Sequence, residues 1–249
     1  MAKQTGIIPL VGTINGVNFY YLHGKPIARK AGGGFTKKAI KSKASMQRVR
    51  ENANEFGYCS AVNKAFRLAM APFYKGYTFP HFHSRLMGLF TRLKTLDTTN
   101  ARGMRTVVNG VGQAEGLRLL EQFNYTPACD VPQVLPFEYG VSDSDYALTF
   151  TDFNIDQVGF VDGATHIALT YGVLDFDFER LDYALHMAAP VVMDGSYAGS
   201  TLTLTPDTLP TVIGTRLLVL GVRFYQMVDG ALYALNAKDS VGLKVLKCF

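Results

Sequence analysis

The electric charge of this chain is divided between its two halves. Residues 1–50 contain ten lysines and arginines and no aspartate or glutamate, and residues 51–126 add nine basic and five acidic residues. Residues 127–249 reverse the balance, with six basic and fifteen acidic residues. Such asymmetry favours a nucleic-acid partner or a complementary contact between chains. The alternative is that the two halves face each other within one monomer.

The composition excludes some classes of protein. Hydrophobic residues make up 48% of the chain and charged residues 18%, which excludes a wholly disordered protein. No run of about eighteen uncharged apolar residues exists, so we expect no membrane insertion. The N-terminus lacks the long apolar core of a secretion signal. Cys59, Cys129 and Cys248 match neither a disulfide framework nor a CxxC metal knuckle, so we expect a cytoplasmic protein with reduced cysteines.

Residues 1–44 read as a basic β-meander followed by a flexible arm. Strands are predicted at 8–14, 17–22 and 25–30, and Asn15-Gly16 is a strong signal for a two-residue hairpin turn. Alternation places Val17, Phe19 and Tyr21 on one face of the second strand. Three glycines at 32–34 predict a flexible joint, and the lysines that follow cannot build a core of their own.

Residues 45–126 show the three-to-four spacing of amphipathic helices. Helices are predicted from about 45 to 72, from 82 to 96 and from 112 to 123, with a weaker one through Arg102 and Arg105. Gly57 is a point at which the first helix could be interrupted, and Pro72 is expected to end it.

Residues 127–249 read as an acidic β-domain. Prolines at 127, 132 and 136 mark a linker, and short apolar segments joined by Asp-Gly turns follow it. Strands are predicted at 147–153, 158–161, 165–173, 181–187, 202–204, 212–228 and 232–235. Short strands at regular spacing are typical of a sandwich. The predicted fold class is α+β: an N-terminal β-meander, a helical region and a C-terminal antiparallel β-sandwich.

One run of acidic residues could carry chemistry. On a strand, Asp175, Asp177 and Glu179 would share one face, with Phe176 and Phe178 on the other. Three carboxylates on one face could bind Ca²⁺ or Mg²⁺. We favour an acidic interface that binds a basic partner, because like charges along a face repel and no further catalytic or metal motif accompanies them.

Other motifs have structural explanations. His81 and His83 could be metal ligands with Cys59, but no regular ligand spacing supports this, and a surface or capping role for His83 is favoured. The glycines between 110 and 116 resemble a phosphate-binding loop without its spacing or its preceding strand, so we interpret them as a helix connection. We therefore predict no catalytic residue, no cofactor and no metal.

The basic N-terminal region is the stronger functional signal. Its cations lie within 26 residues, close to Tyr20, Tyr21 and Phe35, so phosphate neutralisation with base stacking is physically reasonable. No nucleic-acid fold signature accompanies them. The predicted assembly or nucleic-acid contacts are Lys25, Arg29, Lys30, Lys37, Lys38, Lys41, Lys43, Arg48 and Arg50.

Three stretches of sequence resemble a known group of proteins. They are GVNFYYLHGKPIAR at 16–29, RVRENANEFG at 48–57 and GVRFYQMVDGALY at 221–233. Together they are similar to an uncharacterised family of proteins common in Bacteroidota genomes. The resemblance implies an intracellular bacterial protein, and it carries over no activity and no functional residue.

The sequence leads to three hypotheses about function. The first is a non-enzymatic structural protein that self-assembles head to tail into a filament, tube or shell, with its basic arm on the acidic sandwich of a neighbour. The alternative is a nucleic-acid-binding protein that uses the same arm. A carbohydrate- or metal-dependent enzyme at the acidic strand ranks below both.

Overall fold

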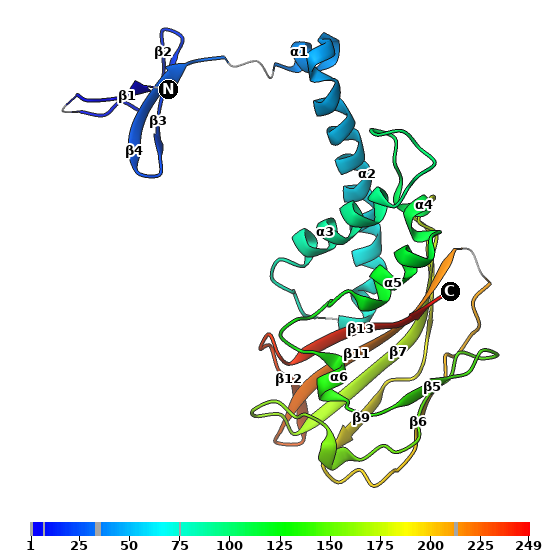
Figure 1. The fold of residues 1–249 in the computed structure, drawn as a ribbon. Coiled ribbons are helices and arrows are strands. Elements are labelled where there is room, and N and C mark those ends of the chain that lie inside the picture. Colours follow the sequence, from blue (N-terminus) through cyan, green and yellow to red (C-terminus); the bar gives the residue numbers. More distant parts are fainter. Residues whose placement is uncertain (1, 7, 33–35, 75, 212–213) are drawn as a thin grey trace. The chain divides into compact units, whose positions relative to one another are not determined.

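The chain forms two compact units, residues 1–54 and residues 55–249. The structure is a computed structural model that describes residues 2–6, 8–32, 36–74, 76–211 and 214–249 (Figure 1). The boundary lies inside helix α2 (Gln47–Met70). It differs from the predicted divisions after residues 44 and 126.

The N-terminal unit contains a four-stranded antiparallel sheet. Its strands are β1 (Ala2–Lys3), β2 (Gly12–Ile14), β3 (Val17–Leu22) and β4 (Lys25–Lys30), in the order β1-β4-β3-β2. Asn15 and Gly16 have φ angles of 47° and 77°, so this turn uses the two residue types that adopt positive φ at low cost. The predicted meander is confirmed, and β1 is an additional strand.

Residues after the meander include regular structure that the sequence did not predict. Helix α1 (Lys37–Ser42) begins after Thr36, whose side-chain oxygen accepts a hydrogen bond from the Ala39 backbone N–H at 3.1 Å. A 3₁₀ turn, η1 (Ala44–Met46), leads into α2. The expectation of an arm without regular structure is therefore wrong for 37–42, while Gly33, Gly34 and Phe35 lie outside the described residues.

The larger unit begins with a helical layer. After α2 come η2 (Ala71–Tyr74), α3 (Phe82–Thr95), α4 (Val107–Val111), α5 (Ala114–Gln122) and the short α6 (Val131–Val134). Gly57 does not interrupt α2, and the weak helix predicted through Arg102 and Arg105 does not form. Within the described part of the chain, no helix is both long and apolar enough to cross a bilayer.

Two antiparallel sheets follow. The six-stranded sheet has β7 (His166–Phe176) and β11 (Thr215–Val228) at its centre. Strands β8 (Tyr183–Met187) and β9 (Val191–Asp194) pair with β7, while β12 (Ala231–Ala234) and β13 (Val241–Cys248) pair with β11. The three-stranded sheet has the order β10 (Leu202–Leu204), β6 (Leu148–Phe150) and β5 (Tyr139–Val141).

These sheets confirm the predicted α+β fold and its β-sandwich, with differences in detail. Residues 158–161 were predicted as a strand and are not one; a 3₁₀ turn, η3 (Ile155–Gln157), lies just before them. Strands β5, β9 and β13 were not predicted. Strand β13 has a signal in the sequence, because Val241, Leu243 and Val245 stand at alternate positions, and all three are buried.

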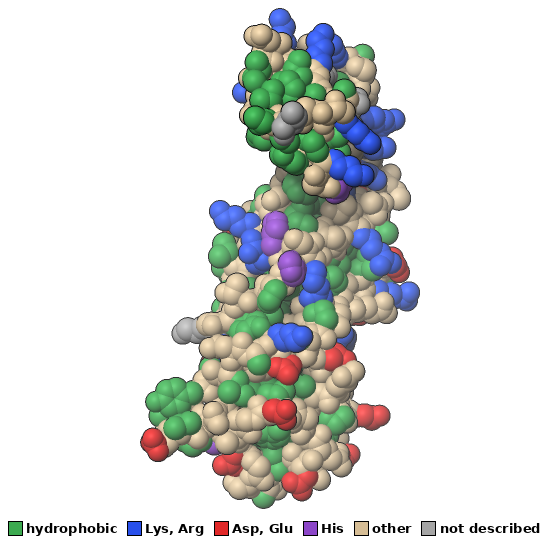
Figure 2. Space-filling model, turned by 90° about the vertical axis from the view of Figure 1, so that its left-hand side faces the viewer, with side chains coloured by type: hydrophobic (Ala, Val, Ile, Leu, Met, Phe, Trp, Pro, Cys, Tyr) green, Lys and Arg blue, Asp and Glu red, His purple; other side chains and the backbone are tan. Residues whose placement is uncertain are grey.

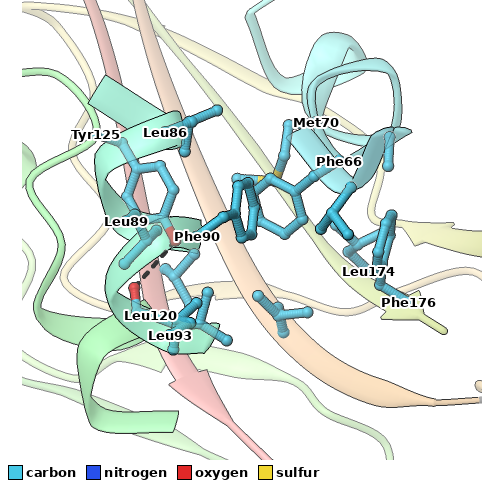
Figure 3. Close-up of a cluster of buried hydrophobic side chains, with 14 of the residues drawn as sticks. Phe66, Met70, Leu86, Leu89, Phe90, Leu93, Leu120, Tyr125, Leu174 and Phe176 are labelled. Atoms are coloured by element: carbon cyan, nitrogen blue, oxygen red, sulfur yellow. Dashed lines mark hydrogen bonds between the residues drawn. The ribbon is translucent and has the colours of Figure 1, made fainter. Parts of the chain in front are cut away.

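The two central strands of the six-stranded sheet, β7 and β11, are buried on both faces over most of their paired length. Along β11, Leu217 and Val219 pack with the helices, while Leu218 and Leu220 pack with the three-stranded sheet. Figure 1 shows α3 and α5 over one face of this sheet and β5 and β6 over the other. In the helix-side core, Phe66 of α2 packs against Phe90 of α3 and against Phe176 of β7 (Figure 3). Helices and sheet therefore share one core across residue 126.

Candidate assembly interface

The N-terminal sheet has two chemically different faces. Residues directly opposite one another in an antiparallel pair lie on the same face. The register therefore defines an apolar face with Ile14, Val17, Phe19, Tyr21 and Ala28. The opposite, basic face carries Lys3, Asn18, Tyr20, Lys25 and Arg29, together with the apolar Leu22 and Ile27.

The basic face presents its cations to solvent. Lys25 and Arg29 are exposed, and the Arg29 guanidinium lies 5.3 Å from the centre of the Tyr20 ring. This pairing is a cation–π contact, which leaves the charge accessible while it orders the side chain. Lys30 is also exposed, but the register puts it opposite Val17 on the apolar face.

The sheet contains very little core of its own. Ile27 is the one buried strand residue among its described positions, with 9% of its surface exposed. By contrast, large apolar side chains lie open on the strands and on the loop before β2, including Ile8 at 79% exposure and Tyr21 at 52%. A small sheet needs a covered hydrophobic face to be stable, so this one is a candidate for contact with another surface.

The remaining predicted cations follow the meander. Lys37, Lys38 and Lys41 lie on α1 and Lys43 follows it, all four exposed. Arg48 is exposed and forms an ion pair with Glu51 at 2.7 Å.

Arg50 differs from the other eight. It is partly buried, and its guanidinium donates hydrogen bonds to the backbone oxygens of Ile40 at 2.6 Å and Lys43 at 3.0 Å. Arg50 therefore fixes the turn between α1 and α2.

The structure does not place Asp175, Asp177 and Glu179 on one exposed strand face, as the sequence predicted. Asp175 is fully buried at the end of β7, where its carboxylate accepts a hydrogen bond from the Gly214 backbone N–H at 2.9 Å. Strand β7 ends at Phe176, so Asp177 and Glu179 lie in the following turn. The Asp177 carboxylate accepts from the backbone N–H groups of Glu179 and Arg180 at 2.8 and 3.0 Å, which explains why the strand stops there.

Exposed carboxylates are instead spread over the loops of residues 127–249, which we call the β domain. Figure 2 shows acidic side chains over this part of the molecule on the face that it draws. Sequence reasoning concentrated on one strand and missed this distribution, which the many Asp-containing turns could have indicated. The exposed acidic residues are Glu138, Asp143, Asp152, Asp156, Asp162, Glu179, Asp182, Asp207, Asp229 and Asp239.

The alternative chemical sites find little support. His81 and His83 are exposed, whereas Cys59 is buried with its thiol 3.6 Å from the Phe90 backbone oxygen. No group of three or more His, Cys, Asp or Glu side chains in the described ranges has the arrangement to hold a metal ion. All three cysteines are buried and free, and burial raises the pKa of the Cys129 thiol to about 12, so that thiol is a poor nucleophile.

The glycine-rich run serves helix packing. A Cβ atom on Gly110 would lie 2.0 Å from the Leu93 backbone oxygen, and one on Gly116 would lie 2.0 Å from the Gly110 oxygen. Any side chain at either position would clash with backbone. The glycines therefore allow α3, α4 and α5 to approach closely, as a helix connection requires.

The most strongly buried charges form a network in the helical layer. Glu55 accepts hydrogen bonds from Arg105 at 2.8 and 2.9 Å and from the Gly103 backbone N–H at 2.7 Å, and it pairs with Lys94. The Arg105 hydrogen bonds are the main reason that the pKa of Glu55 lies well below its usual range.

Asp97 has a related role in the loop that follows α3. Burial alone would raise the pKa of Asp97, but hydrogen bonds from Thr106, Asn100 and Thr99 lower it well below normal. With its carboxylate so occupied, Asp97 organises the loop 98–106 in place of the predicted helix. The charge of each carboxylate is satisfied inside the fold, that of Glu55 by ion pairs and that of Asp97 by hydrogen bonds, which is typical of structural buried charges.

Comparison with known proteins gave no match. No protein family model, no curated protein and no solved structure matches it. Support for a function therefore comes from the surfaces described above.

Proposed function

We propose that this protein is a non-enzymatic structural protein that self-assembles head to tail, with the basic N-terminal unit of one copy on the acidic β domain of the next. The observation that supports this most is the N-terminal sheet, whose described strand residues include one that is buried and several large apolar side chains that are exposed. Covering that face removes apolar surface from water, at roughly 25 cal/mol per Å².

Charge complementarity favours another copy of the chain as the covering surface. Residues 1–50 contain ten basic and no acidic residues, while residues 127–249 have an excess of nine acidic residues. Each chain thus carries one surface of each kind. Contact between two different surfaces is heterologous, so it propagates into a filament, tube or shell unless the rotation closes a ring. The three free, buried thiols suit a reducing compartment such as the cytoplasm.

Sedimentation of a charge-neutralised variant tests this proposal. Lys25→Gln with Arg29→Gln removes two exposed cations from the basic face. The matched control, Lys64→Gln with Arg118→Gln, removes the same two residue types from exposed positions on α2 and α5. We expect the first variant to fold but to need at least about tenfold more protein to assemble than the control, in nuclease-treated samples. A wild-type protein that stays monomeric at every concentration would contradict the proposal.

One observation favours the alternative of nucleic-acid binding. The basic face combines Lys25 and Arg29 with the Tyr20 ring, and such a combination can neutralise phosphates and stack on bases. The same variants decide between the two functions. If Lys25→Gln with Arg29→Gln assembles normally but loses bound nucleic acid, measured by the ratio of absorbance at 260 and 280 nm, the alternative replaces the leading proposal.

A further inference from the structure

The hairpin formed by β11 and β12 is an unusual part of the β domain. Pairing between β11 and β7 ends at Tyr225, opposite His166, but pairing with β12 continues to Val228. The hairpin therefore extends beyond the neighbouring strand β7. It closes through Asp229 and Gly230, whose φ angles of 49° and 80° suit a two-residue turn.

This hairpin exposes apolar side chains on both of its faces. Met227 and Leu232 are opposite each other in the register, and Val228 and Tyr233 lie on the other face. All four are among the exposed large hydrophobic residues, with Tyr233 at 59%. Exposed apolar side chains gathered on one projecting element mark a surface that binds something.

Its outer edge is also unprotected. Strand β12 pairs with β11 alone among the described strands, so one row of its backbone N–H and C=O groups remains open to another strand. Proteins usually guard such an edge with lysine, proline or a bulge. Residues 226–234 contain no lysine, arginine or proline, and their one charged residue is Asp229.

The N-terminal sheet of a second copy has the complementary properties. Its apolar face needs a cover, its edge strand β2 pairs only with β3 among the described strands, and its charge is opposite to that of Asp229. Each chain carries one such sheet and one such hairpin. Pairing two hairpins with each other would leave the open edges and the apolar residues of both N-terminal sheets without a partner. The heterologous contact therefore buries more of the exposed apolar surface.

We propose that the β11–β12 hairpin is the docking site for the N-terminal sheet of the next copy. The proposal rests on the self-assembly proposed above and names the surface that receives the basic unit. Contact pairs the open edges of β12 and β2, so that Val228 and Tyr233, which share one face of the hairpin, lie beside the apolar face of the N-terminal sheet. Strand addition of this kind draws affinity from main-chain hydrogen bonds and specificity from side chains.

A pair of matched variants tests the hairpin. Leu232→Ser with Tyr233→Ser removes two exposed apolar side chains from β12. The control, Val192→Ser with Leu209→Ser, removes two side chains of similar exposure away from the hairpin, one of them on β9. By sedimentation, we expect the hairpin variant to need at least about tenfold more protein to assemble, while the control behaves as wild type.

Cross-linking identifies the occupant and does not depend on that variant folding. One sample carries Ile14→Cys and a second carries Tyr233→Cys; both positions are exposed, and the three native cysteines are buried. After mixing and mild oxidation, we expect a disulfide between the two different chains. Replacing the second sample with Leu209→Cys should give none.

The outcomes separate this inference from the function on which it rests. If wild-type protein assembles but the hairpin variant assembles equally well, or the mixed cysteine variants do not cross-link, the hairpin is not the docking site and self-assembly stands. If wild-type protein never assembles, both proposals fail.

Discussion

The two largest antiparallel sheets of this protein have similar pairing and opposite surroundings. The six-stranded sheet is covered by helices on one face and by a second sheet on the other, so that residues 217–220 of β11 are all buried. The four-stranded N-terminal sheet has regular register and well-formed turns, yet Ile27 is its one buried strand residue in the described part.

The comparison shows that a stable sheet needs both local sequence signals and buried apolar contacts, and that a sheet can have one without the other. Asn15-Gly16 and alternating side chains are enough to define strands and register in the N-terminal sheet. They do not supply the apolar contacts that resist unfolding, because those come from layers packed on the sheet. A sheet that has regular strand pairing but lacks packed apolar layers is suited to complete its core on a partner.

Truncating one phenylalanine in each sheet should give the largest difference. Phe176→Ala opens a cavity among Phe66, Phe178 and the helices, so we expect the free energy of unfolding to fall by about 3–5 kcal/mol. Phe19→Ala on the half-buried apolar face should cost less than about 1 kcal/mol in the dilute monomer. Urea denaturation measures both values, and equal losses would show that the N-terminal sheet is already part of a packed core.

Removing the buried carboxylate should give the next largest effect. Glu55→Gln leaves Lys94 and Arg105 without the anion that they share, so we expect a loss of about 3 kcal/mol in thermal or urea unfolding. The control Glu115→Gln breaks an exposed pair with Arg92 at 4.0 Å and should change stability by less than about 0.5 kcal/mol. Similar effects of both variants would contradict the structural role of Glu55.

Acid gives an independent measure of the same buried carboxylate. The folded-state pKa of Glu55 is depressed, so its contribution is present above the unfolded pKa of about 4.3 and is lost as the pH falls through the folded value. We expect the melting temperature of the larger unit to fall steadily below about pH 4, and to fall less steeply in Glu55→Gln. A melting temperature that is flat between pH 5 and pH 3 would count against this reading.

Much of the fold was predictable, for physical reasons that particular elements show. Helices α2, α3 and α5 have clear apolar spacing, and the hairpin turns at 15–16 and 229–230 use Asn-Gly and Asp-Gly pairs at positive φ. Helix α1 was missed because its stability depends on the Thr36 cap and on the Arg50 hydrogen bonds to the backbone, which composition does not reveal.

The candidate interface was predictable only in part. The nine predicted basic contacts between residues 25 and 50 were found from charge alone, and all of them except Arg50 are exposed. The prediction of an acidic face at 175–179 was wrong because period-two alternation assumes that the strand continues. Asp177 ends the strand, since its carboxylate accepts hydrogen bonds from backbone N–H groups of the turn that follows. The apolar hairpin was predicted as strand, but its exposure follows from the register that carries β11 past β7.

Hydrogen exchange tests the central claim most directly, which is that the N-terminal sheet completes its core on another copy. In dilute monomer, we expect the amides of β3 and β4 to exchange rapidly and those of β7 and β11 to exchange slowly. On assembly at high concentration, protection of β3 and β4 should rise at least about tenfold while β7 and β11 stay unchanged. Strong protection of β3 and β4 already in the monomer, or none in the assembled state, would contradict the account.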